Sequence, residues 1–121
     1  MKIFIKIIIL TYISFTLNIS KTSAEEKIKI GLMIPLTGIH GHIGESIIKS
    51  VRLAIGKIDN SKFEILPRDT QGDPLTTFRA AKDLNNEGIR IVIGPVFNQN
   101  LVNLSEFEDM IFISLTNKNL K

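Results

Sequence analysis

The chain has 121 residues, which is enough for one small domain. It carries 15 basic and 12 acidic residues, a formal net charge of +3, and it contains no cysteine. The absence of cysteine excludes a disulfide, a thiol nucleophile, a cysteine-ligated metal site and a lipid anchor on an N-terminal cysteine.

Residues 1–24 have the pattern of a secretory signal peptide. Two lysines precede an almost continuous apolar stretch over residues 7–17, and small residues end the segment at Ala24. The alternative is a membrane anchor, but a spanning helix needs about 20 apolar residues and this stretch is shorter. We predict cleavage after Ala24, a periplasmic location and a mature domain over residues 25–121.

The positive charge belongs to this leader. Three of the 15 basic residues lie in it and none of the 12 acidic ones do, so residues 25–121 carry no net formal charge. A basic chain would point to nucleic acid or an anionic membrane surface. We therefore predict no nucleic-acid partner.

The first part of the mature chain predicts a strand, a helix and a second strand. Ile28 to Leu36 is mostly apolar, as in an inner strand of a parallel sheet that is covered on both faces. Apolar residues then recur at steps of four, four, four and three, which predicts an amphipathic helix. These residues are Ile43, Ile47, Val51, Ile55 and Ile58. Lys62 to Leu66 follows as a short strand that we expect Pro67 to close.

A second helix is predicted after Asp73. Asp73 can accept the free N–H groups of the first turn, and Pro74 at the first helical position has no N–H to leave unpaired. Gly88 fits the C-terminal stop. The residues expected on its buried face are Leu75, Phe78, Ala81 and Leu84.

Two further strands are predicted, Arg90 to Gly94 and Met110 to Leu115, with a helix between them. That helix rests on the apolar residues Leu101, Leu104 and Phe107. The alternation of strands and helices predicts an α/β fold, a doubly wound parallel sheet of the Rossmann-like kind. Because Lys121 follows the fourth strand with no helix to cover it, we expect a truncated product.

The glycine-rich stretch "TGIHGHIGES" lies between the first strand and helix and could hold a phosphate or a metal ion. Its glycines are spaced G-x-x-G-x-x-G, which is neither the dinucleotide fingerprint nor a P-loop. His40 and His42 supply two ligands at most, and zinc needs three or four. We interpret both histidines as solvated loop residues and predict no metal and no cofactor.

The sequence also lacks the features of a catalytic site. Ser114 lies at a strand end, but the G-x-S-x-G nucleophile motif is absent. Asp69 and Asp73 flank one loop, and Asp73 is explained as a helix cap. We predict that the protein is not an enzyme.

Binding of a neutral or zwitterionic small molecule remains. In open α/β sheets ligands bind outside the carboxyl ends of the strands. Helix N-termini near such a site would favour a carboxylate. The alternative is that these side chains only cap turns and helices. The amide and hydroxyl groups expected at two strand ends are Asn98, Gln99, Asn100, Ser114, Thr116 and Asn117.

Three stretches, "IKIGLMIPLTGIHGHIGESIIKSVRLAI", "RDTQGDPLTTFRAAKDLNNEGIRIVIGPV" and "MIFISLTNKN", together resemble a known family. In order and spacing they are similar to the start of the leucine/isoleucine/valine-binding proteins, periplasmic solute-binding proteins of type I. The most specific elements are P-L-T-G…G from Pro35, D-x-x-x-D-P from Asp69 and I-G-P from Ile93.

The resemblance implies the first part of the N-terminal of two lobes, hinged around a cleft that closes on an amino acid. It implies a non-enzymatic role in ABC-type uptake, with a membrane permease as partner. Ile43 matches a position lining the ligand side-chain pocket, and Asn98 one where a serine commonly holds the ligand carboxylate. Ser114 to Lys118 matches the loop that binds the carboxylate and ammonium groups.

Two segments depart from that pattern and resemble a related group. "FNQN" replaces a serine-rich run, and "SLTNK" replaces the usual serine-proline-small-small-threonine. "LPRDT", "IGPVF" and "ISLTN" look like penicillin-binding-protein activators, which share the fold and regulate peptidoglycan synthesis. The resemblance thus leaves two partners open, a permease with an amino-acid ligand or a penicillin-binding protein.

Overall fold

The computed structural model describes residues 1–6, 26–58 and 61–116. Within these ranges, no helix is both long and apolar enough to cross a membrane. Most of the predicted leader, with its cleavage site, lies outside the described residues. The strands are β1 (Ile28–Ile34), β2 (Phe63–Asp69), β3 (Ile91–Ile93) and β4 (Ile111–Ile113), and the helical segments are α2 (Gly41–Lys57), α3 (Pro74–Asn86), η1 (Asn98–Leu101) and η2 (Leu104–Glu106).

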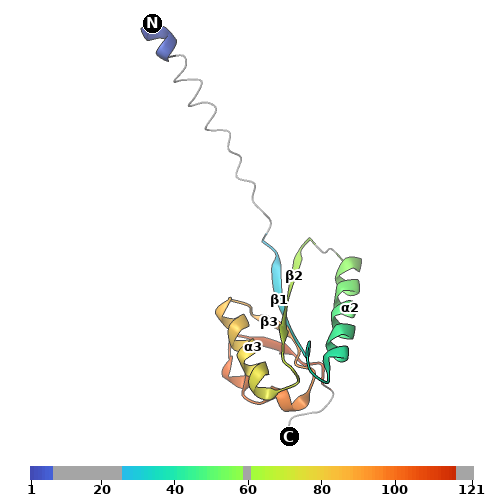
Figure 1. Ribbon diagram of the computed structural model, residues 1–121. Helices are drawn as coiled ribbons and strands as arrows, with labels where there is room; N and C mark the ends of the chain where they lie inside the picture. Colours follow the sequence, from blue (N-terminus) through green and yellow to red (C-terminus); the bar gives the residue numbers. More distant parts are fainter. Residues whose placement is uncertain (7–25, 59–60, 117–121) are drawn as a thin grey trace.

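The four strands form one parallel sheet in the order β2-β1-β3-β4. Ile30 of β1 pairs with Ile65 on one side and with Ile91 on the other. Figure 1 shows α2 and α3 on opposite sides of this sheet. The predicted α/β fold with a parallel sheet is confirmed.

The main core lies on the α3 side of the sheet. Its buried residues are Met33, Ala80, Ala81, Leu84, Ile89, Val92, Leu104 and Met110. On the other side only Gly44 of α2 is fully buried, and the apolar stripe of that helix is at best half-buried. The prediction that both faces of β1 are covered holds only for its second half, where Leu32 and Ile34 are fully buried.

Helix α3 begins and ends as predicted, but its buried face differs. The Asp73 carboxylate accepts the Thr76 N–H at 2.7 Å, and Gly88 ends the helix with φ +78°. Leu75, expected inside, is 57% exposed. The predicted set is spaced by threes, and nine residues at 3.6 per turn rotate by about 180°, so one helix face cannot bury both Leu75 and Leu84. The buried face is Thr77, Ala80, Ala81 and Leu84.

Pro67 does not close β2, because the strand continues to Asp69. The sheet order explains this difference. Among the described strands, β2 lies at the edge of the sheet and pairs with β1 alone, and an edge strand tolerates a proline that cannot donate to a second ladder.

The predicted third helix is wrong, because η1 and η2 replace it with two short 3-10 turns. The apolar residues Leu101, Leu104 and Phe107 recur every three residues, the period of a 3-10 helix. Asn103, between the turns, has φ +66° and prevents a continuous helix.

A candidate binding hollow at the strand ends

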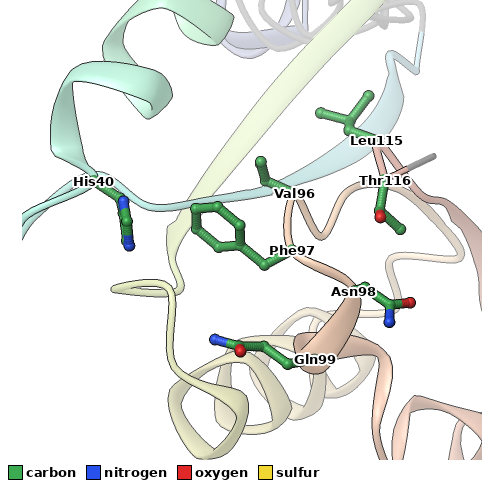
Figure 2. A pocket seen from close by; sticks show the side chains of 7 residues that line it. All are labelled: His40, Val96, Phe97, Asn98, Gln99, Leu115 and Thr116. Carbon is green, nitrogen blue, oxygen red and sulfur yellow. The ribbon is translucent and has the colours of Figure 1, made fainter. Parts of the chain in front are cut away.

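A hollow of about 760 Å³ opens at the carboxyl ends of β1, β3 and β4 (Figure 2). It is lined by His40, Val96, Phe97, Asn98, Gln99, Leu115 and Thr116. These residues come from the loops that follow the three strands, the place where open α/β sheets bind their ligands.

Two rings form one wall of the hollow. The rings of His40 and Phe97 lie 4.7 Å apart between centroids, tilted by 54°, and Figure 2 shows them side by side. Gly72 backs both: a Cβ there would lie 3.1 Å from Cδ2 of His40 and 3.2 Å from Cε2 of Phe97. The ring pair is therefore seated against backbone that comes from the loop after β2.

The polar part of the lining is neutral. Asn98, Gln99 and Thr116 supply amide and hydroxyl groups, and none of the described lining residues is Asp, Glu, Lys or Arg. Nε2 of Gln99 donates to the Gly72 carbonyl at 3.3 Å, which links the loops after β2 and β3. The hollow thus offers apolar, aromatic and hydrogen-bonding groups without a fixed formal charge.

Buried amide groups lie next to this lining. Asn100 is fully buried, and both its amide oxygen and nitrogen lack a hydrogen-bond partner among the described residues. The buried Oδ1 of Asn98 also lacks one there. A buried polar atom without a partner costs free energy of folding. The side chains of η1 therefore include amide groups that could still form hydrogen bonds.

Asp69 fixes the glycine-rich loop that leads to His40. Its Oδ1 accepts the N–H groups of Leu36 at 2.8 Å, Thr37 at 3.3 Å and Gln71 at 2.9 Å, and its Oδ2 accepts the Thr37 hydroxyl at 2.5 Å. Partial burial alone would raise the pKa of Asp69, but these hydrogen bonds together hold that pKa below its usual value.

The residues predicted for the site do not all meet in this hollow. Asn98, Gln99 and Thr116 line the hollow. The Ser114 hydroxyl does not line it and instead accepts the Thr116 N–H at 3.2 Å. Ile43 lines a different, apolar hollow of about 500 Å³ beside α2, which shares Leu115 with the first. Asn117 lies outside the described residues.

The sequence interpretation missed the two rings. His42 is exposed, as expected of a solvated histidine, but His40 is half-buried against Phe97, so the interpretation was wrong for His40. A usable signal existed, since Phe97 is an aromatic residue four positions after the end of β3, in a loop at the edge where open α/β sheets bind ligands. Its partner is 57 positions away, which no spacing rule reveals.

In residues 1–6, 26–58 and 61–116 no three or more His, Asp or Glu side chains are grouped to hold a metal ion. The hollow is suited to reversible binding of an organic molecule through ring contacts and neutral hydrogen bonds.

Residues 27–111 match the family model of periplasmic binding proteins. The chain belongs to this family. It is a family of solute-binding proteins with a periplasmic or extracytoplasmic location. A comparison with curated protein sequences found no match.

Solved structures of the same fold come from two groups of proteins. One is a solute-binding protein of an ABC transporter from Rhodopseudomonas palustris in complex with 3,4-dihydroxybenzoic acid, with 24% identity over 73% of this chain and a TM-score of 0.63. Another is the branched-chain amino acid transporter substrate-binding protein LivJ from Streptococcus pneumoniae in complex with isoleucine, with 18% identity over 74% and a TM-score of 0.66.

The second group is represented by the C-domain of LpoA from Haemophilus influenzae, described as a regulator of PBP1A. It has 22% identity over 74% of this chain and a TM-score of 0.63. The matched region is 26% of the length of the R. palustris protein and 28% of each of the other two. At these identities the similarity shows the shared fold, and this family member spans about a quarter of the length of those proteins.

Proposed function

We propose that this protein is a solute-binding component of an ABC-type uptake system, and that the hollow at the strand ends holds part of its ligand. The observation that carries the proposal is the convergence of three strand-end loops on one concave lining of rings, amides and a hydroxyl. In this proposal the protein performs no reaction, and a membrane permease receives the ligand.

The ligand class follows from two sources. The sequence resemblance favours an amino acid of the branched-chain type, and LivJ is described in complex with isoleucine. The R. palustris protein has the same fold and is described with an aromatic acid. The ligand of this chain is therefore proposed to be a small organic molecule of the size of an amino acid or a substituted benzoic acid.

Ligand binding is testable by a thermal-shift screen of the full-length protein against leucine, isoleucine, valine and 3,4-dihydroxybenzoic acid. A ligand present at 100 times its dissociation constant adds about 2.7 kcal/mol to the free energy of unfolding. We expect at least one of these compounds to raise the melting temperature. A flat response to all of them at millimolar concentration would contradict the proposal.

A second candidate function has its own support, the similarity to LpoA. In that case the protein would bind a penicillin-binding protein and regulate peptidoglycan synthesis. Co-purification from a solubilised envelope extract separates the two candidates. Recovery of a penicillin-binding protein together with a flat ligand screen would favour the regulator, whereas recovery of a permease would favour the transporter component.

Export is a further part of the proposal. The leader pattern predicts that the exported protein begins at Glu25. N-terminal sequencing of the protein recovered from the periplasm of an expressing bacterium checks this. A product that keeps Met1 and stays in the membrane fraction would instead identify residues 1–24 as an anchor.

A further inference from the structure

The described lining of the hollow has no permanently charged side chain for a charged ligand head. A long helix N-terminus after β3 would favour a carboxylate, but η1 has four residues and η2 three, too few for a substantial summed dipole. None of the described lining residues is Asp, Glu, Lys or Arg, and the Asp69 carboxylate is already occupied by Leu36, Thr37 and Gln71. Among the described lining residues, His40 is the one titratable side chain, and none carries a permanent charge to pair with a ligand carboxylate or ammonium.

The same lining is well suited to a flat group. The rings of His40 and Phe97, tilted by 54° to one another, each present a flat aromatic surface, and Val96 and Leu115 add aliphatic surface. Aromatic rings favour other flat rings in offset-stacked or edge-to-face contacts over aliphatic groups of similar size.

The wall is held in place from behind. The contact distances of 3.1 and 3.2 Å leave no space for a Cβ on Gly72, so the two rings already lie against the backbone there. The Gln99 side chain, bonded to the Gly72 carbonyl, lies on the same loop junction. A ligand therefore meets a preformed surface, which reduces the ordering cost of binding.

We propose that this hollow takes the flat, uncharged part of its ligand, an aromatic ring, against the His40–Phe97 pair. Any charged group of the ligand then points away from this lining. The inference rests on the proposed function, that the hollow binds a solute, and it narrows the ligand from small organic molecules in general to molecules with an uncharged aromatic ring.

The experiment compares two probes that share an amide group and differ in the ring, which is aromatic and flat in one and saturated in the other. Benzamide and cyclohexanecarboxamide are titrated against the full-length protein by NMR, with leucine as a third, zwitterionic probe. We expect benzamide to bind roughly three- to ten-fold more tightly than cyclohexanecarboxamide, the range that an aromatic contact contributes. Phe97→Leu and His40→Ala should bring that ratio close to one.

Two further variants separate the ring wall from general effects on folding. Phe97→Tyr keeps a ring and should keep the ratio, and His42→Ala removes an exposed histidine that does not line this hollow and should leave the ratio unchanged. Equal affinity for the two amides, or tighter binding of leucine that Phe97→Leu does not change, would overturn the inference while solute binding stands. Failure of all three probes to bind would overturn the inference and also count against the proposed function.

Discussion

Replacing Gly44 with alanine is expected to lower the free energy of unfolding by about 3 kcal/mol, the upper range for forcing an extra carbon into a packed site. An ideal Cβ on Gly44 would lie 2.0 Å from the carbonyl oxygen of Pro35 and 2.7 Å from its carbonyl carbon. Both atoms belong to the backbone, so no side-chain rotation can relieve the overlap. Helix α2 would have to move away from the end of β1.

Gly56 in the same helix provides the matched control. It is exposed, and a Cβ there would meet no atom within 4 Å. Gly56→Ala should therefore stabilise the protein by up to about 1 kcal/mol through helix propensity. Urea unfolding followed by circular dichroism measures both variants. Similar small effects of the two substitutions would show that α2 does not rest on Pro35.

This contact changes the interpretation of the glycine-rich loop. The spacing of its glycines excluded a phosphate site, and the apolar periodicity predicted a helix from Ile43. Helix α2 begins earlier, at Gly41, and Gly44 is fully buried within its first turn. Gly44 is needed because the helix and the end of β1 approach too closely for any side chain, a reason that depends on tertiary structure.

Elements with strong local signals were predicted well. The first strand, the helix that follows it and the capped helix after Asp73 have apolar periodicity or capping residues that act within a few positions. The failures have physical causes of their own. Leu101, Leu104 and Phe107 fit a period of three residues, which cannot be distinguished from a period of 3.6 in so short a segment. Asn103 adopts the left-handed conformation, which asparagine tolerates but does not require, so its residue type does not predict it.

In the candidate site, too, some features follow from local sequence and others depend on tertiary structure. The location at the strand ends follows from the sheet order, and Asn98, Gln99 and Thr116 were placed there from the sequence alone. The ring wall could not be predicted, because His40 and Phe97 meet only after β1 and β3 pair. The role of Asp69 depends likewise on the pairing of β1 with β2, which brings its carboxylate to Leu36 and Thr37.

Asp69→Ala is expected to lower the free energy of unfolding by about 2 to 3 kcal/mol, the range for losing hydrogen bonds to a charged group at a partly exposed site. The variant leaves the N–H groups of Leu36, Thr37 and Gln71 without this acceptor. Asp69→Asn separates geometry from charge. Its amide oxygen can still accept the three N–H groups, and its amide nitrogen can donate to the Thr37 hydroxyl, so we expect a loss of only about 1 kcal/mol.

The pH dependence of stability distinguishes Asp69→Asn from the wild type. The pKa of Asp69 is lowered in the folded state, so the unfolded state binds more protons as the pH falls. The stabilisation by the carboxylate is complete well above the unfolded pKa of about 3.9 and is lost as the pH falls through the lower folded value. In the asparagine variant this component is absent, so the two stability curves should converge in acid.

Other carboxylates remain in both proteins and do not obscure the comparison. Hydrogen bonding to Lys49 lowers the pKa of Glu45, and the Thr76 N–H lowers that of Asp73, so both proteins lose some stability in acid. The difference between the two urea midpoints, measured from pH 7 to pH 2.5, therefore reports Asp69. A constant difference across that range would mean that the charge of Asp69 does not contribute to the stability of the loop before His40. The hydrogen-bond geometry of its side chain would then be sufficient to position this wall of the hollow.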